Sequence, residues 1–554
     1  MSTPAPPRPG PLDNPFYYLD NFHRVTEWIA ERYGDLLSDE ERAFIARFPG
    51  LSRPSRALLV RMVMRKGELF RASKLRYEEI GATAEAAAPL AKLGWIDEHP
   101  LLSLEQVFGL MTKMEIADAF CDHLPKASAR KAEQLDILRA VFADERHFGE
   151  WHPSSSDRVY RLLVDPLCER LRLMFFGNLH QDWTEFVLSD LGIYRYETVE
   201  FSASSRGFRT REDINAYLHL HRCRERLELG EPPEDILQDI SSIALENDWL
   251  EGRRAKLLFR LAQQCERDSE PVRALDIYSA CRYPEARLRT IRVLEKLERF
   301  DAAFAMAQAA MQTPESETES QQLARILPRL HRRLGLPKIP NAPSTPIERI
   351  DLRLPQAEDW VEVLAARHLA QDDAPVYYVE NTLITSLFGL LCWQAIFAAV
   401  PGAFFHPFHA APADLHSPDF HRRRAQEFAH CLSQLDSGEY VETINRHFID
   451  KAGIQSPFVA WGVLTEELKD LALACIPATH LKKFFERILR DIPANRAGLP
   501  DLVQFWPQKQ RYRMIEVKGP GDRLQDNQIR WLDYCAVHGM PAAVCYVQWT
   551  EDGE

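Results

Sequence analysis

Apolar residues recur at helical spacing near the start of the chain, where most of the polar positions between them are basic. This pattern predicts an amphipathic helix within residues 53–76 that ends before a turn at Gly67. We expect a second helix over residues 77–93 and an extended stretch over residues 94–102. The apolar positions that define the first helix are Leu58, Leu59, Met62 and Val63.

The order helix, helix, extended stretch is typical of a small winged-helix unit, and its first segment is strongly basic. The whole chain is acidic, with 68 Lys and Arg against 81 Asp and Glu and a formal net charge of −13, so it should not bind polyanions indiscriminately. Either a solvated face or a phosphate-binding surface explains a local basic segment. Against the single acid Glu68, the segment carries Arg53, Arg56, Arg61, Arg65, Lys66, Arg71, Lys74 and Arg76.

Two short helices are predicted next, over residues 104–110 and 113–121, with Ser103 as the N-cap of the first. The pair is similar to a SAP-type DNA-binding module, although a generic helical hairpin has the same pattern. Basic residues that would contact DNA follow the pair: Lys126, Arg130 and Lys131.

The middle of the chain, residues 202–336, has an almost wholly helical pattern. Paired helices with small residues at packing positions resemble tetratricopeptide-type hairpins, but no regular period of about 34 residues can be laid over them. Polar, Pro-rich breaks at residues 312–322 and 337–346 predict a surface loop and a linker, and hence a domain boundary near residue 345. A basic cluster within the array either contacts a nucleic-acid backbone or is solvated: Arg282, Arg287, Arg289 and Arg292.

Residues 383–400 are apolar enough to suggest a membrane span, but Thr385, Ser386 and Gln394 interrupt the run, so we expect a buried core helix. The composition, 45% hydrophobic and 27% charged over 554 residues, is that of a soluble globular protein with about three or four domains. The ten cysteines form no CxxC pair, which indicates a reducing, cytoplasmic compartment.

Candidate chemistry is concentrated near the C-terminus, since the chain has no GxxxxGK[ST], HExxH or GxSxG motif. Strands are predicted over residues 502–505, 512–518 and 543–547, with a helix over residues 525–538. Side chains two apart on a strand project from one face, so Glu516 and Lys518 share a face, and Asp501 at the start of the neighbouring strand can reach Glu516. The predicted helix carries Gln528 one turn before Trp531, where Gln528 can face the site.

Two acids beside a buried strand are costly unless a cation compensates them. Ligands that are all oxygen favour Mg²⁺ or Mn²⁺, and the partner of such a site is phosphate. The metal would activate water, and Lys518 would orient that water or stabilise the developing negative charge, so the predicted reaction is phosphodiester hydrolysis. An isolated ExK is more commonly a solvent-facing pair on an edge strand, but PD, then ExK, then a helix with QxxW is a specific combination.

The segments GLPDLV, EVKGPGDRL and QxxW resemble the VRR-NUC subgroup of the PD-(D/E)xK nucleases, and within it the Fanconi-anaemia-associated nuclease family. The segment YYVENTLITSLFGLLCWQ is similar to the family's preceding helix, with Glu380 at its glutamate. The resemblance implies that Asp501 and Glu516 are metal ligands, that the carbonyl of Val517 is a backbone ligand and that Lys518 is the catalytic lysine. It also implies that Glu380 serves a second ion, although an acid near a helix N-terminus has an alternative role with the helix dipole.

Family resemblance further implies a structure-specific, divalent-metal-dependent nuclease that cuts 5′-flap and branched DNA, with a 5′-to-3′ exonuclease activity and a role in interstrand cross-link repair. The family's ubiquitin-binding zinc finger has no counterpart in the sequence, which indicates a compact bacterial form that acts at the nucleoid and not at a membrane. A Holliday-junction or restriction-type endonuclease and a non-catalytic DNA-binding scaffold remain as alternatives.

The expected fold is helical in the N-terminal and middle regions and ends in an α/β restriction-endonuclease-like domain. Its expected parts are a disordered tail (1–13), a basic winged-helix-like region (14–100), a SAP-like module with a helical extension (101–201), a tetratricopeptide-like domain with a linker (202–345) and a VRR-NUC nuclease domain (346–554).

Overall fold

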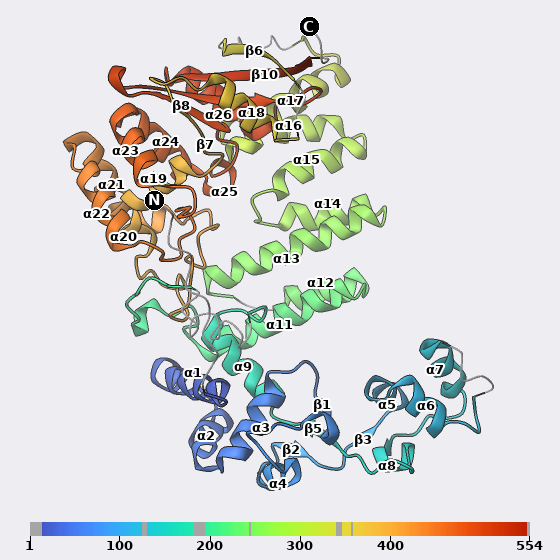
Figure 1. Ribbon diagram of the computed structural model, residues 1–554. Coiled ribbons are helices and arrows are strands. Elements are labelled where there is room, and N and C mark those ends of the chain that lie inside the picture. Colours follow the sequence, from blue (N-terminus) through green and yellow to red (C-terminus); the bar gives the residue numbers. More distant parts are fainter. Residues whose placement is uncertain are drawn as a thin grey trace. The chain divides into compact units, whose positions relative to one another are not determined.

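The computed structural model divides the chain into two compact units, whose elements are labelled in Figure 1. One unit comprises residues 1–194 and 208–214, and the other comprises residues 195–207 and 215–554. The structure describes residues 14–124, 130–181, 194–242, 245–338, 346–355 and 358–550. The expected tail, residues 1–13, and most of the expected linker lie outside these ranges.

The first unit is built on helices packed against a small antiparallel sheet with the strand order β1-β5-β2. Its helices are α1 (Tyr17–Tyr33), α2 (Asp39–Arg47), α3 (Arg53–Val63), α4 (Thr83–Lys92) and α9 (Asp165–Phe176). Its strands are β1 (Leu69–Arg71), β2 (Ile96–Asp97) and β5 (Val159–Leu162). The sheet therefore joins segments on both sides of the boundary expected near residue 100, because β5 returns to pair with β1 and β2.

Between β2 and β5 the chain forms a separate small helical body with its own apolar core. Its elements are β3 (Leu101–Leu102), α5 (Leu104–Leu110), α6 (Lys113–Ala119), α7 (Lys131–Arg139), β4 (Arg146–His147) and α8 (Phe148–Trp151). The predicted helix over residues 104–110 is confirmed, and that over residues 113–121 is confirmed with its end two residues earlier. Ser103 and Thr112 cap them, each accepting a hydrogen bond from the backbone N–H three residues on.

The helix predicted over residues 77–93 is wrong in its first turn and a half. Helix α4 begins only at Thr83, because the preceding residues form a turn that closes at Gly81 with a φ of 77°. A left-handed backbone at this glycine is incompatible with a continuous helix.

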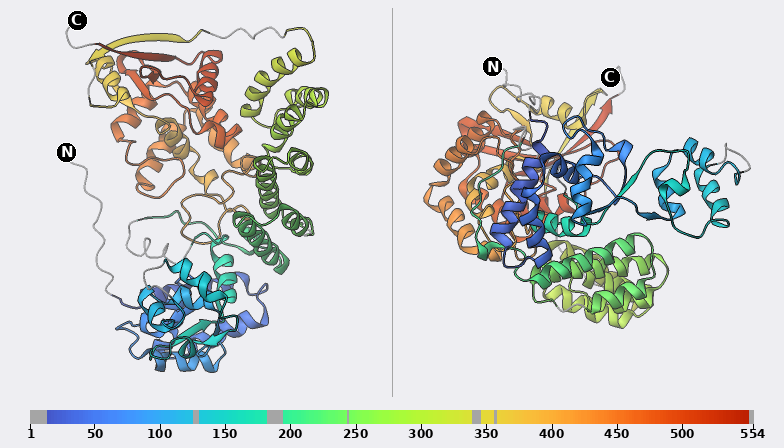
Figure 2. Two further views of the ribbon diagram at one scale, coloured as in Figure 1. Left: turned by 90° about the vertical axis from the view of Figure 1, so that its right-hand side faces the viewer. Right: turned by 90° about the horizontal axis from the view of Figure 1, so that it is seen from below.

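The second unit begins with a stack of helices, which Figure 2 shows from two further sides. Each helix from α13 to α17 packs against the next. These are α12 (Pro233–Ser241), α13 (Asp248–Arg267), α14 (Pro271–Ala280), α15 (Ala286–Lys296), α16 (Phe300–Gln312) and α17 (Glu317–Arg333), and α11 (Arg211–Glu228) precedes them. The helical prediction for the middle of the chain is confirmed. The surface loop predicted over residues 312–322 is wrong in its second half, because Ser316 caps α17 by accepting a hydrogen bond from the N–H of Glu319.

The C-terminal part of this unit contains a five-stranded mixed sheet with the strand order β6-β10-β9-β8-β7. Its strands are β6 (Glu348–Pro355), β7 (Val376–Tyr378), β8 (Leu502–Trp506), β9 (Arg511–Lys518) and β10 (Ala542–Thr550). Strands β6, β10 and β9 are parallel, while β8 is antiparallel to both β9 and β7. The three predicted strands are confirmed as β8, β9 and β10, and the predicted helix is α26 (Asp526–Val537).

A large apolar core lies against this sheet and contains the apolar run of residues 383–400. The run is buried as predicted, but it forms two helices, α19 (Leu383–Leu391) and α20 (Trp393–Ile396). None of the helices in the described ranges has the length and the apolar character needed to span a membrane. The helices that complete this region are α18 (Val361–Leu369), α21 (Ala425–Ser437), α22 (Tyr440–Asp450), α23 (Glu466–Cys475), α24 (Ala478–Arg490) and α25 (Ile492–Asn495).

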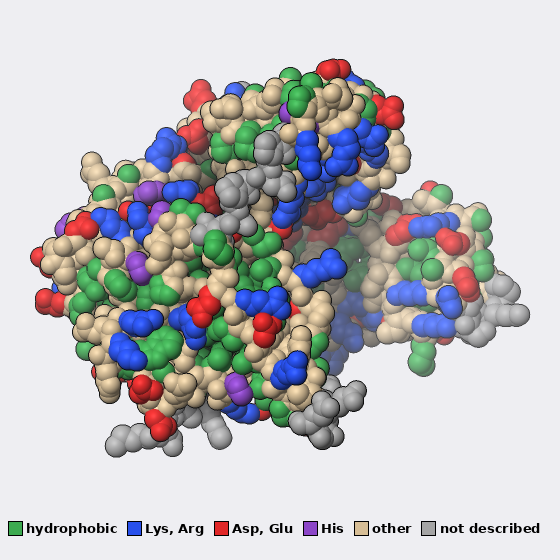
Figure 3. All heavy atoms as spheres, turned by 90° about the horizontal axis from the view of Figure 1, so that it is seen from above, with side chains coloured by type: hydrophobic (Ala, Val, Ile, Leu, Met, Phe, Trp, Pro, Cys, Tyr) green, Lys and Arg blue, Asp and Glu red, His purple; other side chains and the backbone are tan. Residues whose placement is uncertain are grey.

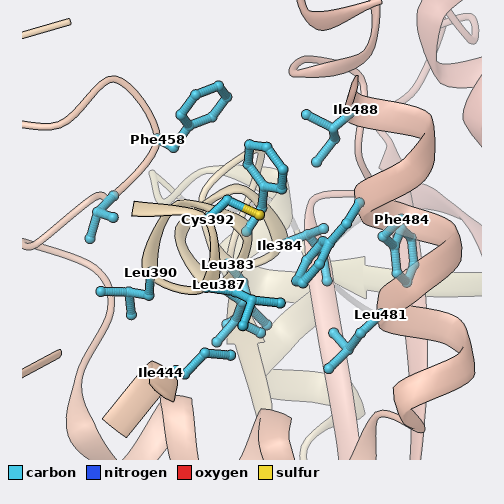
Figure 4. Packing of buried hydrophobic residues seen from close by; sticks show 14 of the residues in the cluster. Leu383, Ile384, Leu387, Leu390, Cys392, Ile444, Phe458, Leu481, Phe484 and Ile488 are labelled. Atoms are coloured by element: carbon cyan, nitrogen blue, oxygen red, sulfur yellow. The ribbon is translucent and has the colours of Figure 1, made fainter. Parts of the chain in front are cut away.

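Helix α19 is tightly packed on all sides, as Figure 4 shows for its neighbours Phe458, Ile444 and Leu481. A Cβ added at Gly389 would lie 2.8 Å from Cβ of Phe458 and 2.9 Å from Cγ2 of Val459. The glycine thus permits the loop at residues 458–459 to approach the helix closely.

We therefore predict that Gly389→Ala lowers the free energy of unfolding by about 1–3 kcal/mol through overpacking. Chemical denaturation of the full chain measures this effect. Gly462→Ala is the matched control, because a Cβ there meets no atom within 4 Å. Equal stabilities of the two variants would contradict the packing argument.

Candidate active site

The pairing of β8 with β9 brings the predicted acids to one end of the sheet. Leu502 is registered with Ile515 in this antiparallel pair, so Asp501, just before β8, lies beside the end of β9 that carries Glu516. Oδ2 of Asp501 accepts a hydrogen bond of 2.8 Å from the backbone N–H of Val517. The carboxylate of Asp501 is thereby fixed against β9.

Glu516 and Lys518 lie on the same face of β9, as the strand periodicity predicts. Their side chains are 0% and 9% exposed, and Nζ of Lys518 lies 2.8 Å from Oε1 of Glu516. Neither carboxylate oxygen of Glu516 has a partner with ordinary hydrogen-bond geometry among the described residues. A buried carboxylate with one ion pair and no hydrogen-bond donor retains unused acceptor capacity.

Burial raises the pKa values of both acids. Desolvation, reinforced by the negative charge of Asp501, raises the pKa of Glu516 to about 8, although Lys518 acts in the opposite direction. Desolvation also raises the pKa of Asp501 to about 6, against the lowering effects of the Val517 N–H and Lys518. The two acids are costly neighbours in the absence of a further cation.

Glu380 joins this end of the sheet from the turn between β7 and α19. The N–H of Val379 donates a 2.8 Å hydrogen bond to the carbonyl of Asp501, which places the turn beside the start of β8. The exposed carboxylate of Glu380 accepts hydrogen bonds from the hydroxyl of Tyr378 at 2.5 Å and from Nδ2 of Asn381 at 3.2 Å. Its negative charge contributes to raising the pKa of both Asp501 and Glu516.

The residues present fit a hard divalent cation. Their donors are carboxylate oxygens together with the backbone carbonyls of β9, and the two buried oxygens of Glu516 are the acceptors that a cation would satisfy. Within the described ranges, no three His, Cys, Asp or Glu side chains already stand in a metal-binding arrangement. The three acids are thus neighbours that would have to converge on an ion.

Gln528 has a structural contact that the sequence did not reveal. Its Oε1 accepts a 2.8 Å hydrogen bond from the N–H of Gln525 and so caps the start of α26. The turn between Lys518 and this helix is held by Asp522, which accepts a hydrogen bond from the N–H of Gly519 at 3.1 Å. A catalytic role of Gln528 stays a prediction.

Glu362 and Tyr378 are further residues of this region that the sequence analysis missed. Glu362, in the first turn of α18, and Tyr378 each interact electrostatically with Asp501. The two residues also interact with each other. Burial and the hydrogen bond to Glu380 raise the pKa of Tyr378. No sequence signal identifies either residue, because each reaches the site only through the pairing of remote segments.

Several of the predicted DNA-binding residues of the first unit already contact other residues of that unit. Arg61 forms an ion pair of 2.7 Å with Glu79 and lies 3.8 Å from the ring centroid of Tyr18, so it is part of the packing. Arg53, Arg65, Lys66 and Arg130 are exposed. Arg53 covers the ring of Phe16, Arg56 contacts His23, Arg65 donates to the carbonyl of Lys74, and Lys131 donates to the carbonyl of Met111. Lys126 lies outside the described residues.

In the helical array, two predicted DNA-binding residues are held by acids. Arg287 pairs with Glu319 at 2.6 Å, and Arg289 lies 3.9 Å from Glu266. Arg292 on the same helix is exposed. Figure 3 shows Lys and Arg side chains gathered on one side of the array.

This sheet, with acids and a lysine at one end and a helix between its last two strands, defines a VRR-NUC nuclease domain. The family model "VRR-NUC domain" matches residues 436–549. The models "FAN1, HTH domain" and "Fanconi anemia-associated nuclease SAP domain" match residues 16–97 and 101–151. The winged-helix and SAP resemblances drawn from the sequence are thereby confirmed.

The chain belongs to the Fanconi-associated nuclease family. It is 56% identical to a Fanconi-associated nuclease 1 homolog of Pseudomonas aeruginosa over 99% of both chains. It is 23% identical to Fanconi-associated nuclease 1 of Homo sapiens over 97% of this chain and 63% of the human protein. A crystal structure of paFAN1 bound to 2nt 5′-flap DNA with a gap matches with a TM-score of 0.91 and 56% identity, covering 98% of this chain and 100% of that one.

The raised pKa of Glu516 predicts how stability depends on pH in metal-free protein. Since the folded-state pKa of about 8 exceeds the ordinary value of 4.5, ionisation of Glu516 costs stability progressively as the pH rises from about 4.5 to 8. Glu516→Gln cannot ionise, so its melting temperature should exceed that of the parent by roughly 2–4 °C at pH 8.5 and by little at pH 5. Thermal melts in a chelator measure this difference, and a gap that does not change with pH would refute it.

Proposed function

We propose that this protein hydrolyses phosphodiester bonds in 5′-flap and branched DNA with Mg²⁺ or Mn²⁺ as cofactor. The observation that supports this most directly is the buried carboxylate of Glu516, which lies beside Asp501 and Lys518 at an end of the sheet and accepts no ordinary hydrogen bond. Burying these charges together lowers the free energy of unfolding. A bound cation and an anionic substrate would compensate the charges, so their placement indicates a functional site.

In this proposal Asp501, Glu516 and the carbonyl of Val517 hold one ion, and Glu380 contributes to a second. Bound divalent ions supply an activated water and neutralise charge on the scissile phosphate. Lys518, held next to Glu516, donates a hydrogen bond to the developing negative charge or orients the attacking water. The hydrogen bond from Val517 keeps Asp501 oriented toward β9 throughout.

Support for the substrate comes from the relatives. The chain resembles a paFAN1 crystallised with 2nt 5′-flap DNA, and a second such structure holds 1nt 5′-flap DNA. The exposed basic residues of the first unit and of the array would bind duplex phosphates without reading bases, and the shape of the junction would select the substrate. A role in interstrand cross-link repair in the bacterial cytoplasm rests on family membership and the bacterial relative.

Lys518→Ala and Asp501→Ala should each reduce cleavage of a 5′-flap substrate by about 10²–10³-fold or more in Mg²⁺ or Mn²⁺, because each removes charge stabilisation at the phosphate. Gel analysis of the labelled products measures the rate. Lys509→Ala is the matched control, since Lys509 is an exposed lysine at the other end of β9. Parent activity in Lys518→Ala and Asp501→Ala would eliminate the proposed site.

The substrate is tested by comparing 5′-flap, 3′-flap, four-way and linear DNA, each with every strand end-labelled in turn. Preferred cutting near a 5′ flap is the expected result. Preferred cutting of four-way or linear DNA would favour a junction-resolving or restriction-type enzyme, and binding without any cutting would favour a scaffold. Progressive shortening of the labelled strand reveals exonuclease polarity.

Charge reversal at Lys66, an exposed lysine, should weaken DNA binding equally for all sequences. The reason is that the proposed contact is to phosphate, which carries no sequence information. The slope of log affinity against log salt concentration should fall by about 0.9 for each lost contact. Fluorescence anisotropy at several salt concentrations measures both quantities, and Lys92→Glu, an exposed lysine on α4, is the control. Arg61→Glu should instead lower stability, because it breaks the pair with Glu79. An unchanged salt slope in Lys66→Glu would count against this DNA contact.

A further inference from the structure

Trp360 is a large apolar side chain left in solvent beside the candidate active site. It is 71% exposed, whereas every other tryptophan in the described part of the chain is buried or partly buried. Its backbone begins α18, since its carbonyl accepts hydrogen bonds from the N–H groups of Val363 and Leu364 at 3.0 and 3.1 Å. Exposing an indole to water forgoes the favourable burial of a large apolar surface.

The first turn of α18 lies at the catalytic end of the sheet. Cγ1 of Val361 is 3.8 Å from the position of a Cβ on Gly519, the residue directly after Lys518. Helix α18 also packs against strand β9, which carries Glu516 and Lys518. Trp360 therefore immediately precedes a residue that adjoins the turn after the lysine.

The position of Trp360 is fixed by the packing of the helix behind it. Ala365 is fully buried against the sheet, in the same apolar cluster as Leu502 and Val517. Asp359, the residue before Trp360, forms an ion pair of 2.5 Å with Arg367, which neutralises its charge. The indole is thus presented from a rigid element without an unpaired acid directly before it.

A second partly exposed ring lies at the same end of the sheet. Tyr378 ends β7, is 40% exposed and donates its hydroxyl to Glu380. Exposed aromatic rings that adjoin a phosphate-binding site are suited to stacking on nucleobases, because every base offers an apolar face whatever its sequence.

We propose that Trp360 stacks on a nucleobase of the cleaved DNA strand next to the scissile phosphate and so positions that phosphate at Asp501, Glu516 and Lys518. This inference rests on the proposed nuclease function and adds to it a specificity-determining residue. Stacking requires an unpaired or unstacked base, which branch points and flaps provide and continuous duplex does not. Trp360 would therefore favour branched over linear DNA without reading sequence.

The test compares Trp360→Leu and Trp360→Phe in the full-length protein. Leucine retains apolar volume but has no ring face, so Trp360→Leu should raise KM for a 5′-flap substrate about 5- to 150-fold while kcat changes little. Phenylalanine retains a ring and should restore KM to within a few-fold of the parent. Val537→Ala is the control, because Val537 is 69% exposed but lies at the far end of α26.

Stacking is measured directly with 2-aminopurine placed in turn at each nucleotide near the cleaved bond, in a Lys518→Ala background whose expected slow cleavage leaves the DNA intact during the measurement. Fluorescence at one position should be quenched on binding, and Trp360→Leu should abolish this quenching while Trp360→Phe retains it. Equal KM and equal quenching in the Leu variant and the parent would overturn the inference while leaving the nuclease intact. Absence of cleavage by the parent protein would instead reject the nuclease function.

Discussion

The carboxylate of Glu516 is buried at one end of the central strand β9, which pairs with β10 on one side and with β8 on the other. Because both neighbouring strands fix the register of β9, Glu516 cannot move to the other face of the sheet without breaking these pairings, so the charge of its buried carboxylate must be compensated on this face. Lys518 supplies one positive charge at 2.8 Å, but the negative charge of Asp501 and desolvation outweigh it and raise the pKa of Glu516 to about 8. The fold therefore retains an electrostatic cost at this point, which a divalent cation would relieve.

Asp501 and Glu380 are positioned by hydrogen bonds that involve the backbone of the neighbouring strands. Asp501 is held by the N–H of Val517, and the turn that carries Glu380 is held by the hydrogen bond from Val379 to Asp501. Behind this turn, α19 is buried, with Gly389 in close contact with the loop at residues 458–459. The packing of an apolar helix thus determines where an exposed acid stands relative to two buried ones.

The parts of the site that sequence predicts are those whose geometry is local. Alternation on a strand places Glu516 and Lys518 on one face without knowledge of the rest of the chain, and the spacing from Asp501 suits two adjacent antiparallel strands. Strand β6 was missed because its partner β10 lies close to the other end of the nuclease region, so neither segment alone identifies the pairing. The loop predicted over residues 312–322 is wrong in its second half for a local reason, because the polar residues there form the N-cap and first turn of helix α17.

The number of basic residues in a segment does not by itself predict a DNA-binding surface, for a different reason. The segment at residues 53–76 is basic in sequence, but Arg71 is buried between Asp157 and Glu115, which come from a later strand region and from α6. Arg61 is similarly committed to Glu79. A basic segment predicts an anion-binding surface only for the residues that folding leaves unpaired, and remote acids decide which those are.

The helical array is joined to the catalytic region through the helix that follows the active-site turn. Arg325 of α17 pairs with Asp526 at the start of α26, and Gln321 accepts a hydrogen bond from Arg530. Glu317 pairs with Arg487, whose guanidinium lies over the ring of Trp531 at 4.6 Å. Because these contacts bind α17 to the first two turns of α26, the array is fixed relative to Lys518 and the turn after it. In the proposed function, DNA bound to the array would therefore lie at a set distance from the acids, because the array and the strand that carries them belong to one compact unit.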